Sequence, residues 1–227
     1  MRSYVSRVIE PEEAAAMSND ELMAAIREGL FINEGATGGA FRSDRKAEYL
    51  ERAIYWCPYC GLSKFESGGN EIVCCTCGRR IVYGEDKRLT GVGFDFLFGS
   101  VADWYDAQSD FVGNLDLSAY AETPAFTDTA DLFDVELNRR KQLIRKDATL
   151  RLYGDRVEID ADEPIVLRFT DIRAAAALGR NKLNLYAAEH TYQLKGDKRF
   201  NALKYVNICY SSKNIDKGDG HGKFLGL

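Results

Sequence analysis

The chain has 227 residues, of which 45% are hydrophobic and 29% charged, as is typical of a globular protein with a sizeable core. Its formal net charge of −5 argues against a general nucleic-acid binder, which should be basic at least in one patch. No apolar run reaches the roughly 18–20 residues of a membrane-spanning helix, and the first residues, MRSYVSRVIEPEE, lack the apolar core of a signal peptide. We therefore expect a cytoplasmic protein whose cysteines are reduced thiols or metal ligands.

Two helices are predicted before the cysteine-rich region. The stretch SNDELMAAIREGL, residues 18–30, has leucine and isoleucine at helical spacing, and Ser18 with Glu21 forms a capping-box signature. SDRKAEYLERAIYW, residues 43–56, predicts a second helix. The glycine-rich segment between them, residues 33–41, is interpreted as a loop, because no Gly-Lys-Ser/Thr follows to make it a phosphate-binding loop.

Residues 57–78, CPYCGLSKFESGGNEIVCCTCG, contain two C-x-x-C pairs, each followed by glycine. Each turn can aim two sulfurs at one ion, and the glycine permits the backbone turn that directs N–H groups at the thiolates. Four thiolates at tetrahedral positions suit zinc and close the coordination shell, which is typical of a structural site. We therefore predict a zinc ribbon over about residues 54–86, with a structural Zn²⁺ bound by Cys57, Cys60, Cys74 and Cys77.

Other roles for these cysteines are weaker. A redox C-x-x-C usually stands alone near a βαβ pattern, which is not evident here, and an iron–sulfur site is a further alternative for cysteine ligands. A catalytic zinc usually keeps one position open and includes histidine or carboxylate ligands. Cys75 could replace Cys74 as a ligand, but the C-x-x-C choice matches the first pair, so Cys75 is expected in a small apolar cluster. Cys209 is interpreted as a core residue.

A helix and a connection follow the ribbon. FGSVADWYDAQSDFV predicts a helix that begins at Ser100, with its aspartates solvated. Its expected buried face consists of Val101, Trp104, Tyr105 and Phe111. GNLDLSAYAETPAFTDTA, residues 113–130, is interpreted as a linker between two modules.

Beyond the linker, the hydrophobic period changes from helical spacing to two. The alternating residues are Leu150 and Leu152, Val157 and Ile159, Ile165, Leu167 and Phe169, Leu183 and Leu185, and Tyr192 and Leu194. Short strands at this spacing, separated by turn signals, indicate an antiparallel sandwich or barrel. The closing stretch KRFNALKYVNICY then predicts a helix, because its large apolar residues recur at helical spacing. Strands followed by one C-terminal helix resemble a pleckstrin-homology (PH)-like or GRAM-like barrel.

The predicted fold class is therefore α+β, with helical segments around a four-cysteine zinc ribbon, followed by the barrel and its helix. The expected organisation is a helical region with the ribbon over residues 1–112, the linker over 113–130, the PH-like domain over 131–213 and a flexible tail over 214–227.

Four stretches resemble the C-terminal accessory region of bacterial 1-acyl-sn-glycerol-3-phosphate acyltransferase proteins. They are VIEPEEAAAMSNDELMAAIREGL, RKAEYLERAIYWCPYCG, VCCTCGRRIVYGE and SVADWYDAQ, which together span about residues 5–115. The catalytic domain of that family needs a His-x4-Asp motif, in which histidine is the general base. His190 and His221, the two histidines of this chain, are followed at that offset by Lys195 and Gly226. The resemblance therefore transfers no catalytic residue, and we expect no catalytic and no cofactor-binding residue beyond the metal ligands.

The sequence favours a non-catalytic, zinc-binding accessory or regulatory module associated with phospholipid acyltransferases. Its expected partner is a protein, such as an acyltransferase domain. The β-domain could also contact anionic lipid at the membrane surface. The residues for that contact would be Arg139, Arg140, Lys141, Arg145 and Lys146, although such charge runs are usually solvated. Two alternatives remain open: a fragment of the acyltransferase enzyme itself, and a zinc-ribbon nucleic-acid binder, against which the acidic balance counts.

Overall fold

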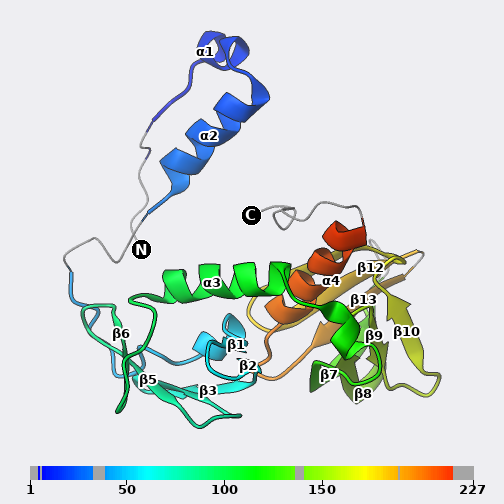
Figure 1. Ribbon diagram of the computed structural model, residues 1–227. Coiled ribbons are helices and arrows are strands. Elements are labelled where there is room, and N and C mark those ends of the chain that lie inside the picture. The colour runs from blue at the N-terminus through cyan, green and yellow to red at the C-terminus, as the bar shows by residue number, and fades with distance from the viewer. Residues whose placement is uncertain (1–4, 6, 33–38, 136–140, 189, 217–227) are drawn as a thin grey trace. The chain divides into compact units, whose positions relative to one another are not determined.

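The computed structural model describes residues 5, 7–32, 39–135, 141–188 and 190–216 (Figure 1). Its contacts divide the chain into two compact units, Met1–Gly39 and Ala40–Leu227, and each is described by itself. Helices and strands are mixed, which confirms the predicted α+β class. In the part of the chain that the structure describes, no helix is long and apolar enough to cross a membrane.

The first unit consists of two short helices, α1 (Pro11–Ala16) and α2 (Asn19–Leu30). The predicted capping box is confirmed: the Glu21 N–H donates to Ser18 Oγ at 3.3 Å, and the Ser18 N–H donates to Glu21 Oε2 at 2.8 Å. Neither helix contains a buried residue, so packing within this unit leaves the apolar stripe of α2 largely exposed.

The second unit begins with the ribbon, which consists of a two-stranded hairpin and a four-stranded antiparallel sheet. The hairpin is β1 (Trp56–Cys57) with β2 (Gly61–Leu62). The sheet has the order β3-β4-β5-β6, with bounds β3 (Phe65–Gly68), β4 (Glu71–Cys74), β5 (Arg80–Tyr83) and β6 (Leu89–Gly91). Buried aliphatic and aromatic side chains from this sheet, together with Cys57 and Cys74, form a small core of their own.

The helix predicted over residues 43–56 is wrong. The structure has only a single 3-10 turn there, η1 (Leu50–Arg52), before β1 begins. Tyr49 is left-handed at φ 73°, and its N–H donates to Ser67 Oγ at 2.7 Å, while the Ala47 N–H donates to the Gly69 carbonyl at 2.9 Å. Backbone bonds to β3 and its turn therefore replace the intrahelical bonds that the sequence pattern favours.

The rest of the second unit is a seven-stranded antiparallel sheet that curls into a nearly closed barrel (Figure 1). Its order is β10-β9-β8-β7-β13-β12-β11, so a four-stranded and a three-stranded meander meet where β7 pairs with β13. The bounds are β7 (Phe126–Asp134), β8 (Gln142–Leu152), β9 (Arg156–Ile159), β10 (Ile165–Arg168), β11 (Ile172–Leu178), β12 (Lys182–Ala187) and β13 (His190–Lys195). With α4 (Leu203–Asp216) after the last strand, this topology confirms the predicted PH-like fold.

The period of two locates most of the strands but not all. The alternating residues of β8, β9 and β12 are buried: Leu150, Leu152, Val157, Ile159, Leu183 and Leu185. The pattern misses β11, whose run of four alanines carries little strand signal. It also misses β7 and most of β8, because the alternating residues begin at Leu150. The start of β7 lies with the 3-10 helix η2 (Leu117–Tyr120) inside the stretch predicted as a linker, residues 113–130.

Helix α4 packs into the barrel and is buried on most of its surface. Tyr205, Ile208 and Cys209 are at most 1% exposed, which confirms Cys209 as a core residue. The side chain of Asn201 accepts a hydrogen bond from the Lys204 N–H at 3.1 Å, at the start of the helix. The predicted tail, residues 214–227, begins within the last turn of α4, and residues 217–227 lie outside the described part of the chain.

Helix α3 (Val101–Gly113) joins the ribbon to the barrel and begins where the sequence predicts, with Ser100 Oγ accepting from the Asp103 N–H at 3.1 Å. Trp104 belongs to the core of the ribbon, and Val112 belongs to the core of the barrel. Figure 1 shows α3 running from the ribbon towards α4, with which it is in contact. Because the two cores share this helix, the ribbon and the barrel behave as parts of one unit, Ala40–Leu227.

Gln108 is a buried polar residue of α3 that links this helix to the segment before the first cysteine pair. Its Oε1 accepts hydrogen bonds from the N–H groups of Tyr55 at 2.8 Å and Trp56 at 3.1 Å, and its Nε2 donates to the Ala53 carbonyl at 3.0 Å. The segment before the first cysteine pair thus has its backbone groups satisfied by one side chain from α3.

Replacing Gln108 with leucine should destabilise the protein by about 3 kcal/mol, because buried backbone N–H and C=O groups lose their partners. The measurement is the denaturant midpoint of the full chain. Asp106→Ala, an exposed change on the same helix, should shift the free energy of unfolding by no more than about 0.5 kcal/mol. Equal effects of the two substitutions would contradict the assigned role of Gln108.

Candidate metal centre

The first cysteine pair lies in the tight turn between β1 and β2. Cys57 ends β1 and pairs with Gly61, while the Cys60 N–H donates to the Cys57 carbonyl at 3.3 Å. Gly61 has φ 86°, a conformation that is strained for a residue with a side chain. The turn therefore brings both thiols to the same side of the hairpin.

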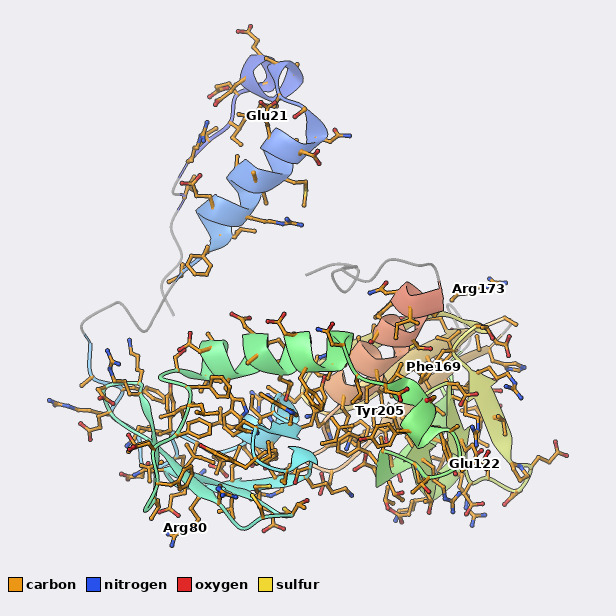
Figure 2. All side chains as sticks on the ribbon, in the orientation of Figure 1. Glu21, Arg80, Glu122, Phe169, Arg173 and Tyr205 are labelled. Carbon is orange, nitrogen blue, oxygen red and sulfur yellow. The ribbon has the colours of Figure 1, made fainter. Side chains whose placement is uncertain are left out.

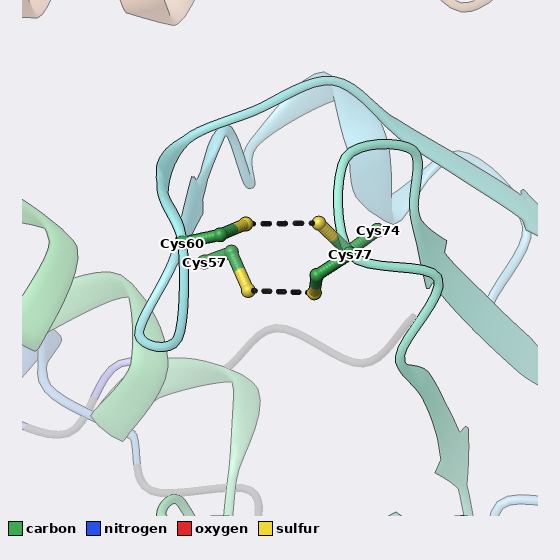
Figure 3. A group of neighbouring side chains, drawn as sticks. All are labelled: Cys57, Cys60, Cys74 and Cys77. Atoms are coloured by element: carbon green, nitrogen blue, oxygen red, sulfur yellow. Dashed lines mark hydrogen bonds between the residues drawn. The ribbon is translucent and has the colours of Figure 1, made fainter.

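The second pair repeats this construction at the end of β4. Cys74 is the last residue of that strand, and its carbonyl accepts the Gly78 N–H at 2.9 Å. Gly78 has φ 71°, and the chain then returns along β5. Two turns from separate hairpins thus face each other across a short gap (Figure 3).

The four predicted cysteines form one cluster. The Sγ atoms of Cys57, Cys60, Cys74 and Cys77 all lie within 4.8 Å of one another. Cys57 Sγ and Cys77 Sγ are 3.7 Å apart, and Cys60 Sγ and Cys74 Sγ are 3.5 Å apart (Figure 3). A tetrahedral site with metal–sulfur bonds of about 2.3 Å has sulfur–sulfur edges of about 3.8 Å, whereas a disulfide needs about 2.05 Å. The cluster therefore has the spacing of a tetrahedral metal site and could hold a metal ion.

The structure also decides between Cys74 and Cys75. Cys74 is buried and belongs to the cluster, whereas Cys75 is exposed. The prediction that Cys75 lies in an apolar cluster is wrong, because neighbouring residues at the end of a strand point to opposite sides. Cys75 instead lies at the surface beside Lys64, whose carbonyl accepts the Cys75 N–H at 2.9 Å.

The environment of the cluster shifts the thiol pKa values in different directions. Burial raises the pKa of Cys57 to about 11. The pKa of Cys77 is instead lowered to about 6. Burial acts to raise it, but hydrogen bonds from the backbone and the guanidinium of Arg79, and then from Cys74 and Cys57, outweigh burial. The chain therefore stabilises negative charge on at least one member of the cluster, as a metal-binding thiolate requires.

Arg79 is the basic residue that hydrogen-bonds to the cluster, and its guanidinium packs on two aromatic rings. Its guanidinium lies 4.3 Å from the ring centroid of Tyr59 and 5.7 Å from that of Phe94. The two other nearby cations are engaged elsewhere. Arg80 forms an ion pair with Glu71 at 2.7 Å and points outwards (Figure 2), and Lys64 donates to the Thr127 carbonyl.

Sequence reasoning misses Ser63, which is buried against the cluster. Its hydroxyl lies 3.2 Å from Cys74 Sγ and 2.9 Å from Thr76 Oγ1. A hydroxyl next to a thiolate can orient the ligand, as groups around metal ligands commonly do. A lone serine between two cysteine pairs carries no signal of this kind in the sequence.

The remaining residues considered from sequence are His190, His221 and the basic run over residues 139–146, of which the structure describes only part. His190 begins β13, where its Nδ1 lies 2.9 Å from Asp134 Oδ2 and its ring stacks on Tyr192. His221 lies outside the described residues, as do Arg139 and Arg140 of the basic run. The described members of that run include two with partners: Lys141 donates to Gln193 at 2.6 Å, and Arg145 pairs with Asp162 at 2.6 Å.

No protein-family model and no curated protein matches the chain. Among solved structures, the N-terminal PH domain of human ARAP2 is similar with TM-score 0.34 and 12% identity, over 44% of this chain and 89% of that one. The N-terminal PH domain of Vps36 is similar with TM-score 0.32 and 19% identity, over 40% and 80%. Because these TM-scores are low, the fold assignment rests on the strand order and the C-terminal helix.

The burial and grouping of the thiols lead to an accessibility test. In protein purified without chelator, iodoacetamide should alkylate Cys75 and spare the cluster and Cys209, as peptide mass spectrometry would show. Burial raises the pKa of Cys75, so the reaction should be run at about pH 8.5. Cys60 is the informative residue, because its side chain is exposed and a bound metal would protect it. Burial and the neighbouring cysteine thiols also raise the pKa of Cys60, so the protection by metal is read as faster alkylation of Cys60 once a chelator is added. Alkylation of Cys60 as fast as Cys75 would contradict a metal centre.

Proposed function

We propose that this chain is a non-catalytic interaction module in which the four-cysteine cluster holds a structural Zn²⁺. The observation that carries the proposal is the set of four sulfur donors at tetrahedral spacing. Four thiolates leave no coordination position for substrate or water, so the site supports folding rather than catalysis. When bound, the metal supplies charge neutralisation and a cross-link between two hairpins.

The contribution of the cluster to stability extends beyond the ribbon. Glu51, just before the first cysteine pair, is 5% exposed and pairs with Arg199, which precedes α4. Arg199 also donates to the Ser67 carbonyl at 2.8 Å, and Asn201 Nδ2 donates to the Glu51 carbonyl at 3.0 Å. Loss of the cross-link would therefore loosen buried polar contacts of the barrel as well.

Exposed apolar side chains in the first unit support an interaction role. On α2 and just after it, Met23, Ile26, Leu30 and Phe31 are 46%, 41%, 77% and 75% exposed. An amphipathic helix with no buried residue gains most of its stability from a partner that covers its apolar stripe. Acidic residues of the first turn flank that stripe, which favours a protein surface over an anionic membrane.

The association with a phospholipid acyltransferase stays a prediction, and it is testable with the purified chain. An acyltransferase domain of that family should be retained by the immobilised chain and not by a chain that lacks residues 1–39. Acyl transfer by the chain alone would support the enzyme-fragment alternative instead. Sedimentation with vesicles containing anionic lipid, or binding of nucleic acid at physiological salt, would favour the remaining alternatives.

The metal proposal gives a quantitative expectation. The purified chain should contain one zinc per molecule by mass spectrometry of the metal, and Cys77→Ser should lose it and unfold about 10 °C or more below the parent chain. Cys75→Ser is the matched control and should retain both the zinc and the unfolding temperature, because Cys75 lies outside the cluster. Iron in place of zinc would identify a different metal, and a metal-free chain of full stability would overturn the proposal.

A further inference from the structure

An open groove of about 810 Å³ lies between the ribbon and the barrel. One wall is β3 with the residues just before it, the other is β7, and the segment between β13 and α4 closes the end. The apolar part of its lining includes Ile54, Tyr55, Phe65, Phe126, Ala130 and Phe200, all of them buried. A volume of this size is within the range of specific ligand sites.

The barrel wall of this groove is an unpaired strand edge. Strand β7 pairs with β8 along its length, but β13 pairs only with its second half, Asp131–Asp134. No strand pairs with the edge opposite β8 over residues 126–130, a span of about 16 Å at the usual rise per residue, and the side chain of Lys64 occupies the Thr127 carbonyl on it. Such an edge can accept an additional strand.

Two hydrogen bonds show which backbone groups face the groove. The Thr127 carbonyl accepts from Lys64, and the Val135 N–H donates to the Thr191 carbonyl on β13. The odd-numbered residues along β7 therefore direct their backbone N–H and C=O groups away from β8. On the other side of β8, the Thr149 carbonyl accepts from the Asp160 N–H, which makes the Thr129–Thr149 pair a non-hydrogen-bonded one. The N–H and carbonyl of Thr129 therefore point along the open edge.

The charged residues that line the groove indicate the charge of the ligand it would bind. Six carboxylates and four cations line it. Of the cations, Lys204 and Lys64 pair with Asp128 at 2.6 and 3.4 Å, and Arg199 pairs with Glu51. Four carboxylates then have no ion-pair partner among the described residues: Glu66, Asp131, Asp147 and Asp197. Lys195 is the fourth cation of the lining, so these carboxylates outnumber it and the groove attracts positive charge.

We propose that this groove binds an extended segment of a partner protein that carries lysine or arginine and adds as a strand to the open edge of β7. Thr129 supplies main-chain hydrogen bonds, the buried aromatic residues receive apolar side chains, and Glu66 and Asp147 pair with the basic ones. The inference deepens the proposed interaction function, because it names the class of partner, but it does not depend on which metal the cluster holds.

The test is selection of peptides from a displayed library of eight random residues against the immobilised full chain, followed by fluorescence anisotropy with the enriched peptides. Enriched sequences should contain an excess of lysine and arginine. Thr129→Pro removes the outward N–H of the edge without removing a hydrogen bond to β8, and it should weaken binding about tenfold or more. Thr129→Val keeps that N–H and should bind as the parent does.

Two charge-reversal substitutions, one inside and one outside the groove, test the role of charge in binding the same peptides. Glu66→Lys should weaken binding about fivefold or more at low salt, and Glu122→Lys, the same change at an exposed site outside the groove, should not (Figure 2). Metal content and unfolding temperature of each preparation separate this inference from the metal proposal. A folded, metal-containing chain would overturn the inference if it enriched no peptide, enriched acidic peptides, or bound equally well after Thr129→Pro and Glu66→Lys.

Discussion

The meeting of four thiols from two hairpins is the constraint on which the ribbon depends. Two of these thiols are buried in a small core, and burial is the largest cause of the raised pKa of Cys57. Four sulfurs within 4.8 Å would repel one another as thiolates unless a cation lay between them. Arg79 reaches the cluster from one side, so a set of four thiolates would need a bound ion for the larger part of the charge compensation.

The ribbon in turn positions the groove. Its first hairpin is tied to α3 through Gln108, and its strand β3 is tied to the start of α4 through Glu51 and Arg199. Between these ties, β3 and the open half of β7 stand on opposite sides of the groove without pairing. A metal clamp beside the proposed binding surface would therefore influence binding, because it holds one wall of the groove in place.

Local signals predicted the parts of the structure that local chemistry determines. The C-x-x-C spacing located all four members of the cluster, and the serines before α2 and α3 located the starts of both helices. The period of two located the strands of the barrel with strongly apolar sequences. Each of these features follows from interactions within a few residues of the chain.

The failures have the opposite origin. Residues 43–56 carry a helical pattern, but hydrogen bonds to β3 and its turn, 18 to 22 residues away, decide their conformation. The first half of β7 and the alanine-rich β11 depend on partners in the sheet, and neither shows an alternating pattern of large apolar residues. Gln108 and Ser63 gain their roles only when distant segments meet, so a single sequence offers no spacing rule that would find them.

X-ray absorption at the zinc edge of the purified chain tests the four-cysteine zinc site, because the spectrum reports the ligands of the metal themselves. We expect one zinc with four sulfur neighbours at about 2.3 Å and no nitrogen or oxygen ligand. A first shell with nitrogen or oxygen at about 2.0 Å would show an open or mixed site and contradict a closed structural clamp. The absence of zinc from a folded chain would contradict it outright.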